Sequence, residues 1–497
     1  MSEPVAASPL PRRPERAVVV GGGITGLVAA LRLSQGGVDV TLIEPDRIGG
    51  KIQTSTFAGR PVDEGADAFL LRVPWAAALA HDLELDGELI SPAARHAQIY
   101  VDGTRRPMPT GHLMGVPADL ASLADTGLLS PGGLERVRAE LALPADPADP
   151  TPGGPDVAVG PYLRRRLGDE VVDHLIDPLL GGINAGDTAT MSLAAVVPQL
   201  DAAARRADPS LLRACQAQLA AAAAATPTST AGTEPPPVFA APLGGMARFV
   251  DAIVGWIPAV DVVAGRRAVA IEPLAPSPSG APRARVALDD GTALDADAVI
   301  VTTSAHVAGP LLANLAPEAA ATLGAIDHSS VAMVTMAFDQ RDLGSIDGFS
   351  GCLVPRDQGL LVTATSFATS KWAQLRDLDR HDAILRTSVG RTGDLRFTDL
   401  DDEALAEAVV DDLGRIADVR GAPTEVRIGR FDRGLPQYAP GHLERIAAAE
   451  AELAGTAVRL AGMALRGVGI PACIRSAEDA AASFGATWPT RRGLAPG

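Results

Sequence analysis

The fold is set by residues 17–44, AVVVGGGITGLVAALRLSQGGVDVTLIE. Residues 17–20 form a short apolar run that is typical of a strand buried in a parallel sheet. This run leads into a G-x-G-x-x-G pattern and then into an Ala- and Leu-rich stretch that favours a helix. A second apolar run, Val38–Ile43, ends on Glu44. The order of strand, glycine turn, helix, strand and acid predicts a dinucleotide-binding unit of the Rossmann type.

Each part of this pattern has a physical role in holding a dinucleotide. Gly21 allows the tight turn after the strand, Gly23 lets a pyrophosphate approach the backbone, and Gly26 lets the helix pack closely on the strand. The helix N-terminus offers N–H groups to the phosphate charge. Glu44 is placed to accept hydrogen bonds from ribose hydroxyls, and its negative charge disfavours the 2′-phosphate of NADP. The alternative is a fortuitous glycine-rich turn, which the flanking strand, helix and acid disfavour.

The composition indicates a globular protein of two or three domains. The 497 residues are too many for one simple core, and 47% apolar with 21% charged residues is ordinary for globular chains. A net charge of −17 argues against nucleic acid and against electrostatic attachment to anionic membranes. Residues 1–16 are rich in proline and are expected to be a disordered leader, not a secretory signal. An odd number of cysteines, Cys215, Cys352 and Cys473, excludes a disulfide framework and favours a cytoplasmic location.

Strand patterns alternate with helical ones beyond the opening motif. A hairpin is expected in 98–109 around Asp102 and Gly103, and 111–237 favours helices broken by proline-rich stretches. The later expected strands are Val260–Val269, Arg283–Leu288, Thr292–Val301, Val331–Phe338, Leu360–Phe367, Ile384–Val389, Glu425–Phe431 and Ala457–Leu460. The later expected helices include Glu403–Ile416 and His442–Ala454. Pro471 then fits the first turn of a last helix.

This order predicts an α/β and α+β protein with three domains. A discontinuous Rossmann-like domain is expected from residues 17–97, 238–304 and 455–490. Residues 98–110 and 305–454 are expected to form a mixed-sheet substrate-binding domain, and 111–237 an inserted helical domain with a mobile Ala- and Pro-rich tail. Because the chain has one G-x-G-x-x-G and returns to glycine-rich sequence at its end, a flavin dinucleotide, FAD, suits it better than a nicotinamide cofactor.

Several longer motifs carry a resemblance to a known family. They are RIGGKIQT (47–54), EGADAFL (64–70), RPMPTGHLMGVP (106–117), LGDEVVDHLIDPLLGGINAGD (167–187), LPQYAPGHLERI (435–446) and GVGIPACIRS (467–476). With these motifs the chain resembles the FAD-dependent protoporphyrinogen/coproporphyrinogen oxidases from about Arg16 to Gly485. That family belongs to a wider class that includes monoamine oxidases and Rab GDP-dissociation inhibitors. Two departures concern the pocket: relatives often read GPDSFL at 65–70, and Ser388 stands where some have tyrosine.

The resemblance implies which residues hold FAD. The adenine end would lie on the first glycine turn, Glu44 and Val269, and the flavin would meet the C-terminal glycine segment. The expected cofactor residues are Gly21, Gly22, Gly23, Ile24, Thr25, Gly26, Leu27, Glu44, Gly50, Lys51, Gly65, Ala66, Asp67, Ala68, Val269, Phe431, Val468, Gly469 and Ile470. A helix beginning at Pro471 would point its N-terminal dipole at the ring. For Phe431 the alternative is ordinary core packing.

The resemblance also implies the reaction. A porphyrinogen would lose six electrons in three rounds of hydride transfer to flavin N5, and dioxygen would reoxidise the flavin with formation of hydrogen peroxide. The backbone carbonyl of Gly182, in a glycine-rich turn, would face the macrocycle as the catalytic group. Asn184 would line the same substrate site, and Arg72 is a planar cation suited to a propionate, although it could equally be a surface arginine. No catalytic histidine and no metal are expected, His174 and His442 are expected to be surface or packing residues, and Cys473 is expected to be inert.

The sequence leaves the substrate open between two porphyrinogens. The acidic chain without a membrane stretch resembles bacterial cytoplasmic members, which favours coproporphyrinogen III, and protoporphyrinogen IX is the alternative. A flavin amine oxidase would need an aromatic cage, which 3% aromatic residues disfavour. A non-catalytic protein of the GDP-dissociation-inhibitor type would be colourless. Expected partners are the porphyrinogen, dioxygen and a transient hand-off to a ferrochelatase, with no nucleic acid and at most peripheral membrane contact.

Overall fold

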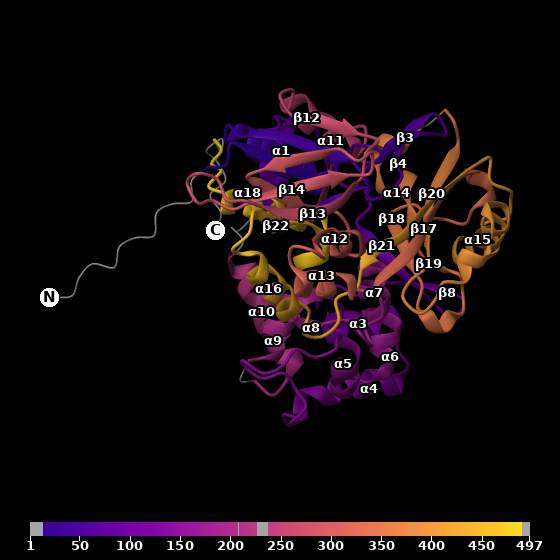
Figure 1. Ribbon diagram of the computed structural model, residues 1–497. Helices are drawn as coiled ribbons and strands as arrows, with labels where there is room; N and C mark the ends of the chain where they lie inside the picture. The colour runs from indigo at the N-terminus through magenta and orange to yellow at the C-terminus, as the bar shows by residue number, and fades with distance from the viewer. Residues whose placement is uncertain (1–12, 207, 226–236, 378, 490–497) are drawn as a thin grey trace.

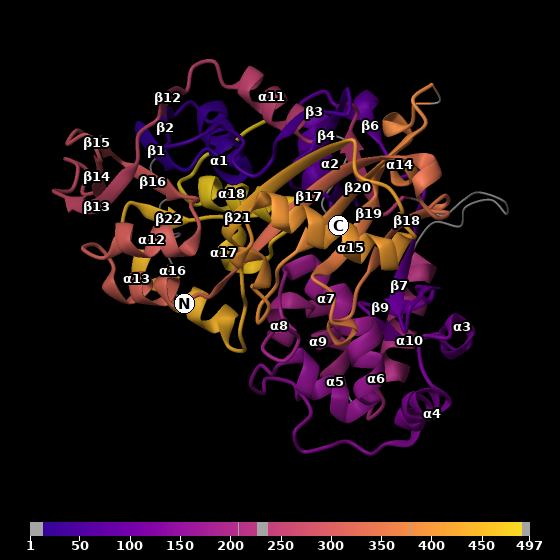
Figure 2. The same cartoon turned by 90° about the vertical axis from the view of Figure 1, so that its right-hand side faces the viewer.

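Three packed regions make up the protein in the computed structural model, which describes residues 13–206, 208–225, 237–377 and 379–489. Figure 1 shows a region that includes both ends of the described chain at the upper left, a mixed sheet, mostly orange, on the right, and purple to magenta helices below. Figure 2 shows the same regions after a quarter turn. No helix in the described ranges combines the length and the apolar character needed to cross a membrane.

A five-stranded parallel sheet forms the centre of the first region. Its strand order is β12 (Asp261–Ala264), β2 (Asp39–Glu44), β1 (Arg16–Val20), β16 (Ala298–Val301) and β22 (Val458–Leu460). The strands predicted at 17–20 and 38–43 are confirmed within one residue. The start of the predicted leader, residues 1–12, lies outside the described residues, and Arg16 already belongs to β1. Because the strands come from the beginning, middle and end of the chain, this sheet is discontinuous in sequence.

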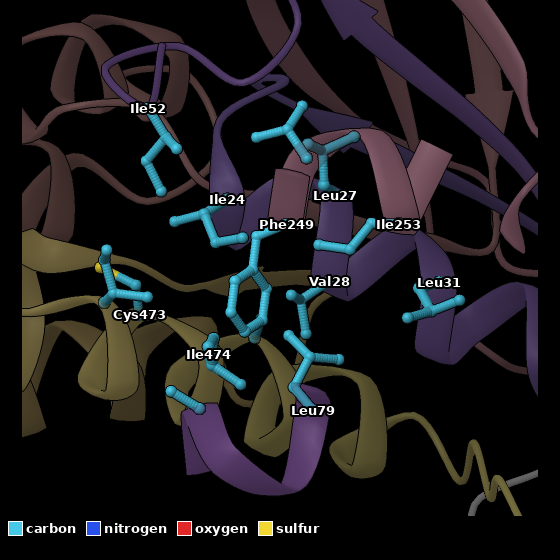
Figure 3. Close-up of a cluster of buried hydrophobic side chains, with 14 of the residues drawn as sticks. Ile24, Leu27, Val28, Leu31, Ile52, Leu79, Phe249, Ile253, Cys473 and Ile474 are labelled. Atoms are coloured by element: carbon cyan, nitrogen blue, oxygen red, sulfur yellow. The ribbon is translucent and has the colours of Figure 1, made fainter. Parts of the chain in front are cut away.

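The core beside this sheet joins the first helix to the last. Figure 3 shows side chains of α1 (Ile24–Gln35), among them Leu27 and Val28, beside residues of three other helices. These helices are α2 (Trp75–Asp82), α11 (Ala247–Trp256) and α18 (Ile470–Ser483). Each large apolar side chain buried here contributes about 1.5–3 kcal/mol. The apolar face of α1 is therefore fully covered only when α18 is in place.

A buried ion-pair network fastens three of the same helices. The Arg32 side chain on α1 is 2% exposed, and its Nη2 lies 2.7 Å from an Asp82 oxygen and 2.6 Å from a Glu478 oxygen. Removing one partner of such a buried network typically costs about 3–5 kcal/mol. The network thus links α1 to α2 and α18 in one orientation.

A seven-stranded mixed sheet forms the second region. Its order is β21 (Glu425–Pro436), β17 (His328–Asp339), β20 (Asp382–Val389), β19 (Val362–Phe367), β18 (Phe349–Leu353), β7 (His96–Val101) and β8 (Thr104–Pro107). The predicted hairpin turn at Asp102 and Gly103 is confirmed, and both residues have the positive φ that such a turn requires. The helix predicted at 403–416 is α15 (Asp402–Ala417). The sequence analysis missed β18, because its sequence FSGCL lacks a clear alternation.

Two of the predicted strands are each divided between two sheets. The strand expected at Val260–Val269 breaks at Gly265, whose φ of +70° turns the chain from β12 into β13 (Ala268–Leu274). The strand expected at Thr292–Val301 is likewise split into β15 (Ala293–Ala296) and β16. β13 and β15 pair with β14 (Arg283–Leu288) in an antiparallel sheet. Period-two patterning did not reveal these breaks, since both halves are extended.

Helices dominate the third region, between β8 and β11 (Phe239–Pro242). They are α3 (Leu120–Thr126), α4 (Pro131–Ala139), α5 (Val159–Leu167), α6 (Asp169–Val171), α7 (Asp177–Asn184), α8 (Leu193–Val196), α9 (Pro198–Ala204) and α10 (Leu211–Ala225). Most of the predicted mobile tail, residues 226–236, lies outside the described residues. The expected glycine-rich turn at 181–184 is wrong: these residues are helical, and α7 ends only where Ala185 takes a positive φ of 47°.

The remaining strands and α-helices lie between the elements already named. They are β3 (Thr54–Phe57), β4 (Arg60–Asp63), β5 (Phe69–Leu70), β6 (Leu89–Ile90), β9 (His112–Leu113), β10 (Val116–Pro117), α12 (Ala305–Leu312), α13 (Pro317–Gly324), α14 (Ala368–Lys371), α16 (His442–Leu453) and α17 (Met463–Arg466). The expected final helix is confirmed as α18, with Pro471 in its first turn.

Candidate functional site

A first cavity, of about 230 Å³, lies beyond the carboxyl ends of β1, β2 and β16. This edge is where ligands bind in parallel α/β sheets. The residues lining it are Val20, Gly21, Gly23, Ile43, Glu44, Pro45, Arg267, Ala268, Thr302, Thr303, Ser304, Val307 and Leu311. The cavity is therefore placed where a dinucleotide is expected.

The glycines of the first turn differ in what surrounds them. Gly21 has a φ of +108°, and a Cβ on Gly26 would lie 1.8 Å from the Gly21 carbonyl oxygen, so both must be glycine for the strand and helix to pack. A Cβ on Gly23 would meet no atom within 4 Å. Gly23 is also the N-cap of α1, and because it has no side chain, no side-chain hydrogen bond caps the first N–H groups of this helix. The open space thus lies at a helix N-terminus, where a pyrophosphate is stabilised.

Glu44 ends β2 at the edge of this cavity, with 9% of its surface exposed. One carboxylate oxygen accepts a hydrogen bond from the Gly22 N–H at 2.6 Å, and the other accepts from the Asp46 N–H at 2.9 Å. These two bonds fix the orientation of the carboxylate. A carboxylate has about four acceptor positions, so Glu44 retains capacity for ribose hydroxyls.

A second cavity, of about 570 Å³, continues from the first, because Gly23, Thr302 and Ser304 line both. It runs between the nucleotide turn, the start of α18, the mixed sheet and α7. Its lining is Gly23, Ile24, Thr25, Gly49, Gly50, Lys51, Ile52, Gly65, Ala66, Gly181, Gly182, Ile183, Ala185, Thr302, Ser304, Val331, Ala332, Met333, Thr363, Ser388, Gly390, Phe431, Gly434, Leu435, Met463, Val468, Gly469, Ile470 and Cys473. Among these residues Lys51 carries the one formal charge and Phe431 the one aromatic ring.

Most of the predicted site residues line one of the two cavities. Those that do are Gly21, Gly23, Ile24, Thr25, Glu44, Gly50, Lys51, Gly65, Ala66, Gly182, Phe431, Val468, Gly469 and Ile470. Those that do not are Gly22, Gly26, Leu27, Asp67, Ala68, Arg72, Asn184 and Val269. Gly26 and Leu27 instead serve the packing of α1, and Gly22 donates to Glu44.

Asp67 takes part in an ion-pair network behind the cavity wall. Its carboxylate lies 2.8 Å from Lys371 Nζ and 3.1 Å from Arg386 Nη1, and it accepts a hydrogen bond from the Trp372 indole. Burial alone would raise the pKa of Asp67, but Lys371 and Arg386 outweigh it and hold the pKa well below its ordinary value. Arg386 also donates to the Gly65 carbonyl oxygen. Asp67 therefore positions the Gly65–Ala66 segment, which lines the cavity, through Arg386.

Lys51 and Cys473 are the titratable side chains that line the second cavity. The Lys51 ammonium donates to the Gly434 carbonyl oxygen at 2.6 Å, and desolvation lowers the pKa of Lys51. The Cys473 thiol is buried, and burial raises its pKa. A raised pKa keeps this thiol protonated and unreactive. Among the lining residues the formal charge is thus carried by Lys51, which its bond to Gly434 holds in place.

The N-terminal end of α18 points its free N–H groups toward the second cavity. Gly469 is its N-cap, Pro471 stands in the first turn, and Val468, Gly469 and Ile470 all line the cavity. A helix N-terminus carries about half a positive charge. This end of the cavity therefore favours a ligand that becomes negative.

The opposite wall is α7, which is held from both ends by Arg356. Arg356 Nε donates to the Asp177 carboxylate at 2.9 Å, its Nη2 donates to the Gly186 carbonyl oxygen, and its Nη1 donates to the Thr392 carbonyl oxygen at 2.9 Å. Asp177, which begins α7, is 5% exposed. These bonds fix the helix whose Gly181–Ile183 stretch faces the cavity, with Ile183 50% exposed.

Asn184, Val269 and Arg72 line neither cavity. The Asn184 amide donates to the Leu180 carbonyl oxygen within its own helix. Val269 falls at a register shift between β13 and β14, next to Arg267 and Ala268, which line the first cavity. Arg72 is exposed; burial lowers the pKa of His112, and the charge of Arg72 lowers it further.

Sequence reasoning missed the Thr302–Ser304 segment and the cavity residues of β17. Thr302–Ser304 follows directly after β16, whose four residues are all buried. The rule that ligands lie beyond the carboxyl ends of parallel strands could have found it. Met333 and its neighbours carry no local signal of a ligand, because they belong to an ordinary apolar strand that becomes a cavity wall only through its tertiary contacts.

The chain is similar to known proteins over most of its length. A family model described as flavin containing amine oxidoreductase matches residues 24–483. The chain is 31% identical to a Bacillus subtilis protein named coproporphyrinogen III oxidase, over 93% of this chain and 96% of that protein. A Mycobacterium bovis protein of the same name is 34% identical, over 95% and 97%. A solved Exiguobacterium structure with the provisional name protoporphyrinogen oxidase has a TM-score of 0.79 at 30% identity and covers 95% of this chain and 98% of that one.

Proposed function

The chain belongs to the family of flavin containing amine oxidoreductases, and from this premise we propose that it oxidises coproporphyrinogen III to coproporphyrin III. Its cofactor is FAD, and dioxygen is the proposed electron acceptor. The observation that carries the proposal is the likeness to proteins named coproporphyrinogen III oxidase over at least 93% of the chain. That span includes all three regions that line the second cavity.

The residues of the two cavities fit FAD. Glu44 suits the ribose, the open space at Gly23 suits the pyrophosphate, and the N-terminal end of α18 suits a reduced flavin, which is negative. Lys51 and the Gly65–Ala66 segment line the route between them. When bound, FAD supplies a two-electron acceptor for hydride lost from a methylene bridge of the porphyrinogen.

The chain's own residues contribute binding and shape more than acid–base chemistry. The second cavity is largely apolar, which suits a macrocycle, and its titratable lining groups are one amine and one buried thiol. Gly182 on α7 exposes its backbone to the cavity and is proposed to face the macrocycle. Exclusion of water and orientation of the substrate are then the main tasks. Arg72 is proposed as a partner of a propionate, since it is exposed and planar.

The cavity lining argues against an amine oxidase. An amine held by an aromatic cage needs several rings, and Phe431 is the one aromatic residue among those that line the second cavity. Cyclohexylamine oxidase from Brevibacterium oxydans resembles the chain at 18% identity with a TM-score of 0.65, which shows a shared fold alone. A porphyrinogen is therefore the better-supported substrate.

Steady-state assays with both porphyrinogens test the substrate. Coproporphyrinogen III carries four propionates and protoporphyrinogen IX carries two, and each charge-assisted hydrogen bond contributes about 1.5–3 kcal/mol. One additional bond of this kind corresponds to about tenfold. We therefore expect kcat/KM, measured by the rise of porphyrin fluorescence, to be about tenfold higher or more for coproporphyrinogen III than for protoporphyrinogen IX. Equal or faster turnover of protoporphyrinogen IX would reverse the assignment. A purified protein without bound flavin would instead favour a non-catalytic binding role.

A further inference from the structure

A π-helical turn, η3 (Val172–Ile176), leads directly into α7. π-helical turns are rare in proteins, and many of those that occur lie at functional sites. Here the turn places His174 at the boundary between the helical region and η5 (Arg356–Gln358), a short helical turn of the mixed-sheet region. The same turn η5 carries Arg356, which binds the start of α7.

Both nitrogens of the His174 ring face acceptors. Nδ1 lies 2.9 Å from the Leu128 carbonyl oxygen, and Nε2 lies 3.0 Å from an Asp357 carboxylate oxygen. A neutral imidazole has one N–H and can satisfy only one acceptor, whereas an imidazolium donates to both. The His174 side chain is 14% exposed and the Asp357 side chain 45%, so the pair lies at the edge of the packed region. His174 therefore satisfies both acceptors at once only in its protonated form.

We propose that protonated His174 acts with Arg356 as a two-point clamp that positions α7 and thereby sets the affinity of the cavity for the porphyrinogen. The clamp joins η5 to the helical region at Asp357–His174 and at Arg356–Asp177. Gly181–Ile183 of the clamped helix line the cavity. His174 and Arg356 are positioning residues that need not touch the substrate. The inference about affinity rests on the proposed function.

The charges around His174 make the clamp sensitive to pH. Burial alone would lower the pKa of His174, but the hydrogen bonds to Leu128 and Asp357, with further attraction from Asp357 and Glu170, raise it above its ordinary value of 6.5. Nearby Asp173 pairs with Arg164, and Asp177 pairs with Arg356. Because the folded pKa is raised, the clamp is complete below the ordinary value and is lost as pH rises through the folded value. KM for the porphyrinogen should therefore rise at alkaline pH.

The test compares steady-state kinetics of three variants with the wild type across about pH 6 to 9. His174→Gln can donate to one acceptor but presents an amide oxygen to the other. We expect its KM at about pH 6 to be roughly fivefold above wild type, which corresponds to about 1 kcal/mol, and to vary little with pH. Its kcat and its FAD content should stay close to those of the wild type.

Asp357→Asn separates the clamp from a merely structural role. The introduced amide can donate to the unprotonated Nε2 of His174, so protonation is no longer needed. We expect a low KM that no longer rises with pH. His81→Gln is the matched control, because it removes a His–Asp pair of 2.8 Å that joins α2 to the following turn, distant in sequence from α7. The control should keep the wild-type pH profile.

Hydrogen exchange of the α7 amides tests the positioning independently of turnover. Exchange rates are expressed relative to those of an unstructured chain at the same pH. In His174→Gln, exchange in α7 should be about tenfold faster at every pH than in the wild type at about pH 6. The wild type should reach this faster exchange only at alkaline pH. A His174→Gln variant with the KM profile and the exchange rates of the wild type overturns the clamp. A wild type that turns over neither porphyrinogen but shows the exchange pattern overturns the proposed function and leaves the clamp supported.

Discussion

A Gly23→Val variant is expected to fold normally but to purify without FAD, colourless and inactive. A Cβ at this position meets no protein atom within 4 Å, so the added side chain begins in open space. It occupies the space at the N-terminus of α1 where the pyrophosphate must approach the backbone. We expect the affinity for FAD to fall by more than about 100-fold, or roughly 3 kcal/mol. Flavin absorbance per mole of protein, with circular dichroism for the fold, measures both effects.

Gly26→Val provides the contrast within the same motif. Its Cβ would lie 1.8 Å from the Gly21 carbonyl oxygen, so this variant cannot keep the packing of α1 on β1. It should be insoluble or unfolded, whereas Gly23→Val should remain folded. A yellow and active Gly23→Val protein would refute the placement of the pyrophosphate at this turn.

Asp67→Ala is expected to lower the free energy of unfolding by about 3–5 kcal/mol, because it leaves the Lys371 and Arg386 cations without their shared carboxylate. It should also weaken FAD binding, since Arg386 holds the Gly65 carbonyl oxygen in the cavity wall. Urea unfolding followed by circular dichroism measures the stability, and titration of the apoprotein with FAD measures the affinity. An Asp67→Ala protein that unfolds at the same urea concentration as wild type would contradict the role of the network.

The stability difference caused by Asp67 should depend on pH in a defined direction. Burial opposes ionisation of Asp67, but Lys371 and Arg386 dominate and depress its pKa below the ordinary value of 3.8. The stabilisation is thus fully present above that value and is lost as pH falls through the folded pKa. Asp295→Ala is the matched control: it breaks an Arg285–Asp295 contact of 2.7 Å at the surface, which should cost at most about 1 kcal/mol.

Local patterns were sufficient to predict the nucleotide-binding half of the site. The turn from Gly21 to Gly26 and the acid at Glu44 follow from constraints that act within one strand–helix–strand unit. Both cavities are lined by residues of this unit. The final glycine segment was also predictable, since Pro471 marks the start of α18. In each case the residues that decide the structure are close together in sequence.

Long-range contacts account for what the sequence analysis missed or misplaced. Asp67 was assigned to the cofactor from its motif, but Lys371 and Arg386, which engage it, lie about 300 residues away. The glycines of α7 look like a turn in sequence, yet Arg356 from the mixed-sheet region holds the Asp177 and Gly186 groups that flank them. Tertiary context of this kind overrides local propensity and leaves no periodic signal.

The assembly of the parallel sheet from both ends of the chain has a consequence for synthesis on the ribosome. β1 and the turn at Gly23 are made long before β22 and α18, so β22 can pair with β16 only late in synthesis, and α18 can cover α1 only after residue 483 has been made. At about 5–20 residues per second, tens of seconds pass between the translation of Gly23 and that of Ile470. During that interval the nascent chain exposes the apolar face of α1 and lacks the wall that α18 provides. Stable capture of the cofactor therefore has to wait for the synthesis of α18, and until then the exposed apolar surface makes the nascent chain prone to aggregation.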